Sequence, residues 1–243
     1  EIVSSNDNLR CFITKKIGDM SLQEYSNEEF NPALTFDALL LYKKIQDSFS
    51  LDGLDSFLSK EVIDWREGEF LAYYERMLAN EERLFTWGIT QEDFTALKNR
   101  INTVAELKLK LHSYHETATL NHSDLNDSNI RVELGTEEIS IIDWGEINLA
   151  NPLLSLSSFL YGIRRRYNLT RDNSEDYKKL EDHAFKLYGV KDEDIEDAIE
   201  TSYILGILYY IFTYIDLMKR CSFEFPNQHA KLYKALKEFI ERT

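Results

Sequence analysis

Residues 121–130 read NHSDLNDSNI, and residues 141–146 read IIDWGE. Between them lie two short β-rich runs, NIRVEL and EISIID, on either side of Gly135, and this pattern predicts a β-hairpin. A hairpin returns the chain to its starting point, so Asp143 at its end is expected close to the loop that carries Asp124 and Asn129. The two stretches therefore predict two carboxylates and one carboxamide in a single site.

These residue types meet the needs of phosphoryl transfer. That reaction requires a carboxylate to orient or deprotonate the attacking hydroxyl, and oxygen ligands to hold Mg²⁺ against the phosphates. We predict Asp124 as the catalytic base and Asn129 and Asp143 as ligands of Mg²⁺, which prefers hard oxygen donors and keeps several waters. The first stretch alone also fits an ordinary turn, because Asp, Asn and Ser favour turns, but turn chemistry does not explain the second stretch.

HSDLNDSNI followed by IIDWGE resembles the loop and metal-binding segment of the aminoglycoside phosphotransferase and choline kinase-like family, which has a protein kinase-like fold. The resemblance covers most of the chain. It implies an enzyme that uses ATP or GTP, with Mg²⁺, to phosphorylate a hydroxyl of a small molecule. Many members carry a further bracing Asp. Here the segment reads ANPLLSLSSF, with Ser155 near that place, which is closer to a less characterised branch of the family.

The resemblance also implies a nucleotide site. FITKKIGDMSL resembles the interlobe hinge strand and its Gly turn. Carried over, the backbone of Thr14 and Lys16 contacts adenine, Ile13 lies behind the base, and Ile142 helps to form the floor of the pocket. The partners implied are thus a nucleotide and a small-molecule alcohol.

The implied organisation is a hinge segment over residues 1–20 and a kinase-like C-terminal lobe over residues 21–243, of which residues 152–243 form a helical substrate subdomain. His122 resembles the family's structural histidine and is expected to pack and to orient the loop. The spacing after Asp143 favours a small-molecule kinase over a protein kinase, because only nine positions separate it from Pro152 and no A-P-E follows.

The family's β-rich N-terminal lobe carries a loop over the phosphates, a strand Lys and a helical Glu. This chain opens about ten residues before the hinge strand, and we locate neither a Gly-rich loop nor a strand Lys–Glu pair in it. We therefore expect the C-lobe of a longer protein, whose site is completed by that lobe or by a second copy of the chain. A non-catalytic kinase-like scaffold or regulatory domain is the alternative function.

Composition restricts the partners further. Forty-three acidic against 28 basic residues give a net charge of −15, which argues against nucleic-acid binding. Two cysteines, Cys11 and Cys221, and the lack of a signal-peptide pattern fit a reducing cytoplasm. The apolar run at residues 203–215 holds four tyrosines. It is shorter than the roughly 20 residues that a bilayer requires, so we expect a buried core helix and no membrane.

The remaining pattern predicts a mainly α fold of the α+β class with a small β insert. A strand is expected at residues 11–16 and helices at residues 36–49 and 68–85. Capping-box spacing occurs at Ser21 with Glu24 and at Thr90 with Asp93. The second box opens a long amphipathic helix that ends near His115. After residue 152 the chain is expected to be all helical, with a break inside residues 192–220.

Three charged features leave alternatives open. The arginines at residues 164–166 form a solvated helix end or attract an anionic substrate. Residues 171–200, with five basic and eleven acidic side chains, form a solvated face or favour a cationic substrate. Glu146 contacts a second metal or the substrate, or it lies on the surface where the hairpin ends.

Overall fold

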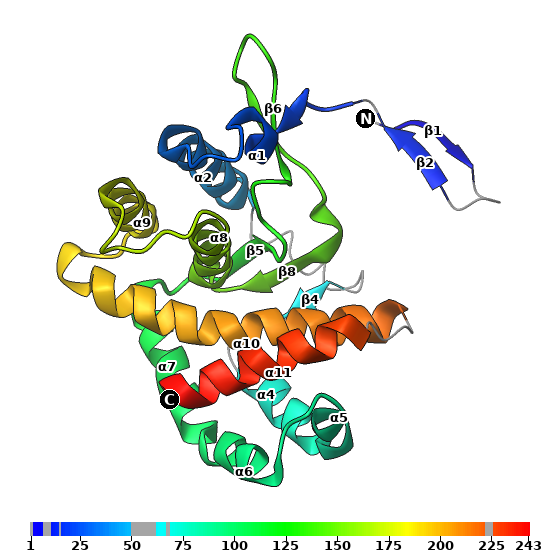
Figure 1. The fold of residues 1–243 in the computed structure, drawn as a ribbon, viewed down its shortest axis with the longest axis vertical. Helices are drawn as coiled ribbons and strands as arrows, with labels where there is room; N and C mark the ends of the chain where they lie inside the picture. Colours follow the sequence, from blue (N-terminus) through cyan, green and yellow to red (C-terminus); the bar gives the residue numbers. More distant parts are fainter. Residues whose placement is uncertain (1, 7–10, 15, 50–61, 67–68, 222–225) are drawn as a thin grey trace.

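The computed structural model describes residues 2–6, 11–14, 16–49, 62–66, 69–221 and 226–243. Most of the described residues lie in helices, and three small sheets, two short 3-10 helices and connecting loops make up the rest (Figure 1). The mainly α prediction is confirmed. The helices are α1 (Leu22–Tyr25), α2 (Pro32–Asp47), α4 (Glu69–Ala79), α5 (Glu81–Thr86), α6 (Gln91–Asn99), α7 (Ile101–Tyr114), α8 (Pro152–Arg166), α9 (Glu175–Leu187), α10 (Ile195–Cys221) and α11 (Pro226–Arg242).

The described strands form three sheets. Strands β1 (Ile2–Asn6) and β2 (Cys11–Thr14) make an antiparallel pair that projects from the body in Figure 1. In the second sheet, β6 (Ile130–Val132) lies between β3 (Met20–Ser21) and β7 (Ile139–Ile141), and both pairs are antiparallel. In the third, β8 (Ile147–Ala150) lies between β4 (Ile63–Asp64), to which it is parallel, and β5 (Thr119–His122), to which it is antiparallel.

The hairpin predicted around Gly135 is confirmed as β6 and β7. The third sheet has no counterpart in the sequence predictions. Its strands hold only two to four residues each. Alternation over so few positions does not rise above chance, because a half-buried strand is recognised over about four to eight residues.

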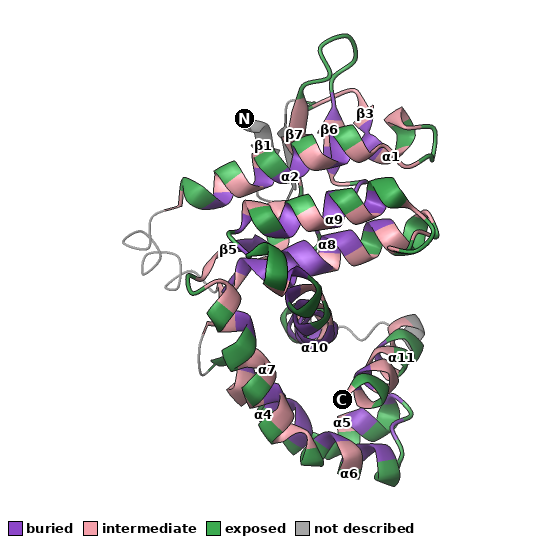
Figure 2. Ribbon diagram, turned by 90° about the vertical axis from the view of Figure 1, so that its left-hand side faces the viewer, coloured by how far each residue is buried: buried purple, intermediate pink, exposed green. Residues whose placement is uncertain are grey.

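Helix α10 forms the centre of the molecule, packed against α7, α8, α9 and α11. The break predicted inside it is wrong, since it runs without interruption from Ile195 to Cys221. Gly206 serves close packing instead: a Cβ there would lie 2.9 Å from Ser157 Oγ on α8. Figure 2 shows α10 end-on and largely buried.

The described stretch Asp192–Arg220, which contains most of α10, is long and apolar enough to cross a membrane by length and composition alone. Of its most apolar window, 67% is buried inside the protein. This is the environment of a core helix, as predicted. The expectation that the protein has no membrane partner stays a prediction.

Both capping boxes are present, at Ser21 with Glu24 and at Thr90 with Asp93. Two helices that we predicted as continuous are divided. The helix at residues 68–85 becomes α4 and α5, because Asn80 caps α5 by accepting from the Arg83 N–H. The long helix behind Thr90 becomes α6 and α7. Short helices that turn at these points can wrap their apolar faces around the core, which the periodicity of a straight helix does not reveal.

Gly18, in the segment before β3, gives the first testable prediction. Its φ is +63°, and a Cβ there would lie 2.6 Å from the Cβ of Arg131. Gly18→Ala combines left-handed backbone strain with a steric clash, so we expect it to lower the free energy of unfolding by about 1–3 kcal/mol. Chemical denaturation measures this change.

Gly162→Ala is the matched control. Gly162 lies inside α8, and a Cβ there would meet no atom within 4 Å. Because Ala is the better helix former, this substitution should raise the free energy of unfolding by about 0.5–1 kcal/mol. Equal effects of the two substitutions would contradict the conformation described for Gly18.

Candidate functional site

The registers of two strand pairs bring the three predicted catalytic and metal-binding residues to one end of the protein. In the pairing of β5 with β8, His122 lies opposite Ile147, so the loop after β5 and the turn before β8 are adjacent. Where β6 meets β7, the pairing continues beyond the strands, because the Ile142 N–H donates to the carbonyl of Asn129 at 3.0 Å. Asp143 is therefore the next residue after the partner of Asn129.

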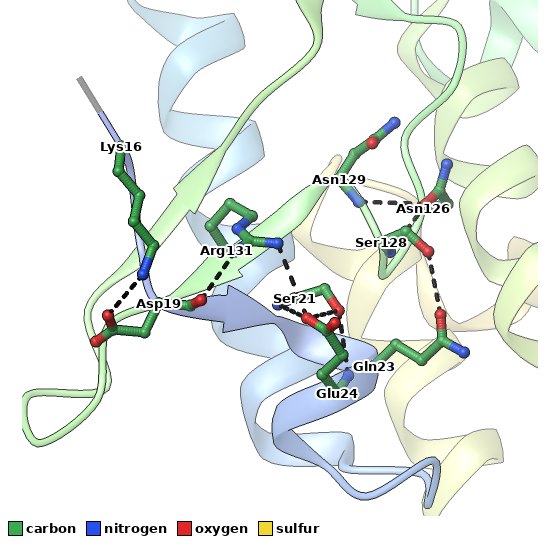
Figure 3. Close-up of polar contacts among 9 residues, drawn as sticks. All are labelled: Lys16, Asp19, Ser21, Gln23, Glu24, Asn126, Ser128, Asn129 and Arg131. Carbon is green, nitrogen blue, oxygen red and sulfur yellow. Dashed lines mark hydrogen bonds and ion pairs between the residues drawn. The ribbon is translucent and has the colours of Figure 1, made fainter. Parts of the chain in front are cut away.

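The loop between β5 and β6 holds Asp124 and Asn129 together directly. The Asn129 side-chain amide donates to the Asp124 carbonyl at 2.8 Å and to its carboxylate at 3.2 Å. Asn126 stabilises the same turn, because its Nδ2 donates to Asp124 Oδ1 at 3.1 Å and its Oδ1 accepts from the backbone of Ser128 and Asn129 (Figure 3). We did not predict this role for Asn126, although Asn is a typical residue for such side chain-to-backbone turns.

The oxygens expected to bind Mg²⁺ are available. Asp143 is exposed, its φ of 63° turns the backbone sharply, and its carboxylate makes no hydrogen bond or ion pair with a described residue. The Oδ1 of Asn129 accepts no hydrogen bond from the described chain either. No cluster of three or more His, Cys, Asp or Glu ligands occurs among the described residues. The carboxylate and the amide oxygen fit Mg²⁺, which binds through one or two protein groups and keeps several waters.

His122 is 1% exposed and holds the loop from within. Its Nδ1 accepts from the Asp124 N–H at 3.2 Å, which leaves Nε2 to donate to the Ile142 carbonyl at 2.9 Å. Its ring lies 4.9 Å from that of Trp144. Burial lowers the pKa of His122, which favours this neutral form. The contacts agree with packing and loop orientation as its role.

A buried hydroxyl network that includes Ser155 braces the start of the loop. The His122 N–H donates to the Tyr42 hydroxyl at 2.8 Å, Tyr42 donates to Ser155 Oγ at 3.0 Å, and Ser155 donates to Asn121 Oδ1 at 2.6 Å. Burial raises the pKa of Tyr42, so the phenol stays protonated and can donate. Sequence analysis placed Ser155 at this position but missed Tyr42, because a core tyrosine on a distant helix carries no sequence signal for this contact.

Negative charge accumulates at this end of the protein. Glu146 is half-buried, and burial raises its pKa, assisted by the neighbouring charges of Asp124 and Asp143. Asp216 adds a further carboxylate, while Arg220 opposes the effect and pairs with Asp216. Glu146 is therefore close enough to Asp124 and Asp143 to feel their charge, and both alternatives for its role stay predictions.

The residues expected to bind the nucleotide base are spread over separate parts of the structure. Ile13 and Thr14 lie on β2, whose hairpin pairs with no other strand of the described chain. Lys16 is exposed, and its Nζ binds Asp19 at 3.0 Å (Figure 3). Ile142 is half-buried beside Asp143. The structure does not bring the hinge residues to Ile142, and their roles stay predictions.

Comparisons with known proteins support the fold. No protein-family model matches the chain, and no curated protein matches it. Among solved structures, ethanolamine kinase of Plasmodium vivax is similar, with a TM-score of 0.60 and 17% sequence identity over 96% of this chain. The match covers 66% of that enzyme, so this chain spans slightly less than two thirds of its length.

The similarity shows a kinase-like fold. At 17% sequence identity, the similarity does not show that the chain belongs to the aminoglycoside phosphotransferase branch. That assignment, the C-lobe boundaries and the absence of an N-terminal lobe stay predictions.

Tyr42→Phe tests the hydroxyl brace. The substitution keeps the ring but leaves the buried His122 N–H without its acceptor and removes the donor to Ser155. We expect the free energy of unfolding to fall by about 1–3 kcal/mol, the cost of an unsatisfied buried polar group. Tyr25→Phe is the control, because Tyr25 bonds only to the exposed side chain of Glu137 and its loss should cost about 0.5 kcal/mol or less. Equal losses in the two variants would rule out the brace.

Proposed function

We propose that this protein transfers the terminal phosphoryl group of ATP or GTP to a hydroxyl of a small molecule. The observation that supports the proposal best is the convergence of Asp124, Asn129 and Asp143, produced by two strand registers inside a kinase-like fold. If the loop with Asp124 and Asn129 were only a structural turn, the chain would have no need to bring the unpaired carboxylate of Asp143 beside it through a hairpin.

In the proposed reaction, Asp124 accepts the proton of the substrate hydroxyl. The hydroxyl oxygen forms a bond to the γ-phosphorus as the bond from that phosphorus to the leaving diphosphate oxygen breaks. The Asn129 amide fixes the Asp124 carboxylate through the 3.2 Å hydrogen bond, so the base is oriented before substrate binds. Asp143 and the Asn129 oxygen would hold Mg²⁺, which neutralises charge on the phosphates.

A small cationic alcohol, such as an amino alcohol, fits this site best as substrate. Around Glu146 lie the carboxylates of Asp124, Asp143 and Asp216 and, with the opposite charge, the guanidinium of Arg220. Asp143 would hold Mg²⁺ and Asp124 would engage the substrate hydroxyl, which leaves Glu146 and its surroundings to attract a positive group. The name of the structural neighbour, an ethanolamine kinase, points to the same chemical class.

Phosphoryl transfer from ATP and GTP should be measured against amino alcohols, neutral sugars and aminoglycosides, and we expect the amino alcohols to react. Asp124→Asn should lower kcat by about 10²–10⁴-fold, because it removes the general base. Glu138→Gln is the control, since Glu138 is an exposed carboxylate in the loop of the β6–β7 hairpin and should leave kcat unchanged. Turnover of Asp124→Asn at the normal rate would exclude Asp124 from the mechanism.

Asp143→Ala addresses the metal. The substitution removes the only charged ligand in the proposed pair, so Mg²⁺-dependent binding of the nucleotide should be lost. Isothermal titration calorimetry with ATP, in the presence of Mg²⁺ and then of EDTA, measures this directly. If the variant retains a binding enthalpy that still depends on Mg²⁺, the metal is held by other residues.

A further inference from the structure

We propose that Asp127 is a positioning residue, which fixes the catalytic loop against the end of α8 in the helical part of the protein expected to bind the substrate. The proposal deepens the proposed function and rests on it. Asp127 lies between the base Asp124 and the metal ligand Asn129, and it was not singled out as functional in the sequence.

Asp127 is buried although its loop is otherwise polar. Its exposure is 1%, whereas Asp124 and Ser128 on the same loop are exposed. A buried carboxylate is costly unless it is paired and hydrogen-bonded. Both of its oxygens are engaged: Arg166 Nε lies 3.0 Å from Oδ1, and the Tyr167 hydroxyl donates to Oδ2 at 2.8 Å. Because Asp127 is buried and both of its oxygens already have a partner, we infer that it acts by holding the loop and not by contacting metal or substrate.

Both partners of the Asp127 side chain lie at the C-terminal end of α8. Arg166 is the last residue of α8, and Tyr167 is its C-cap, held by a hydrogen bond from its N–H to the Ile163 carbonyl. The Tyr167 ring lies 6.0 Å from that of Phe30. Burial and the bond to Asp127 raise the pKa of Tyr167, so its hydroxyl remains a donor. Arg166 and Tyr167 thus present two directed donors to one carboxylate.

Helix α1 provides a second contact with the loop. The Gln23 N–H in α1 donates to the carbonyl of Asp127 at 3.4 Å, and Ser128 Oγ donates to the Gln23 side chain at 3.1 Å (Figure 3). The half of the loop that leads into Asn129 is therefore held between α1 and the end of α8. If the contact with α8 is lost, the loop keeps its internal turn but loses its position relative to the helical substrate subdomain.

The contact with Asp127 also gives a role to one of the three arginines at residues 164–166. Arg166 is more than a solvated charge, because it pairs with Asp127. Arg165 next to it is exposed and forms no ion pair with a described residue. The two side chains carry the same charge in the same helical turn, which provides a matched control.

The test compares Asp127→Asn, Arg166→Gln and Tyr167→Phe with the control Arg165→Gln in the complete protein. For the first two variants we expect kcat to fall and the Mg²⁺ concentration for half-maximal rate to rise, each by about 10- to 100-fold, which is typical when a supporting partner of a metal site is lost. The KM for the alcohol should change less than about twofold, because no substrate contact is removed. Tyr167→Phe should show the same pattern more weakly, and Arg165→Gln should match the unmodified protein.

The double variant Asp127→Asn/Arg166→Gln should be no less active than the more impaired of its two single variants, because both substitutions break the same interaction. A merely structural role gives a different result: the melting temperature falls while kcat per folded molecule stays normal. That result, or a kcat in Arg166→Gln equal to that of Arg165→Gln, overturns the proposal.

Hydrogen exchange separates this proposal from the proposed function. If the unmodified protein transfers no phosphate, the proposed function has failed, and amide exchange across residues 123–129, followed by mass spectrometry, still tests the contact. Faster exchange in Asp127→Asn and Arg166→Gln than in Arg165→Gln supports a loop held by α8. Equal exchange in all three variants overturns it.

Discussion

The antiparallel pairing of β5 with β8 is the constraint on which the site depends. With His122 opposite Ile147, the loop that starts at Ser123 and the turn that ends at Glu146 must lie side by side. Ser123 strengthens this junction, because its Oγ donates to the Glu146 carbonyl at 2.6 Å. A slip of one residue would turn His122 out of the core and reverse the face of every side chain on β5. Together with the register of β6 on β7, this pairing places the polar residues at this end of the protein.

Buried polar contacts then convert a flexible loop into a fixed one. The hydroxyls of Tyr42 and Ser155 hold the start of the loop, and the carboxylate of Asp127 holds its second half. Each contact is directional and lies away from water, where a hydrogen bond is strong and an unpaired group is costly. Together with the hydrogen bonds of Asn126 and Asn129 within the turn, these contacts fix the loop, and the proposed base Asp124 would be oriented before a substrate binds.

The distribution of charge suits this arrangement. The chain carries an excess of acidic residues, and several of them meet near Glu146. Carboxylates that lie close together repel one another, and the proposed metal ion and cationic substrate would relieve that repulsion.

The sequence by itself determined the elements whose signals are local. The hairpin around Gly135, the capping boxes at Ser21 and Thr90, and the pairing of one loop with one returning carboxylate could all be predicted, because each depends on residues close in the chain. The division between α6 and α7, the continuity of α10 and the third sheet could not, since packing against distant segments decides them. The division at Asn80 follows from a local cap whose signal the sequence analysis missed.

Within the candidate site, the sequence predicted which residues would perform chemistry, and those roles stay predictions, whereas the residues that hold the loop were not predicted. Tyr42 and Arg166 contact the loop only because the fold places them beside it, and Asp127 is buried only because Arg166 and Tyr167 reach it. A hydrogen bond depends on distance and direction in space, and the linear order of residues specifies neither for contacts between distant helices.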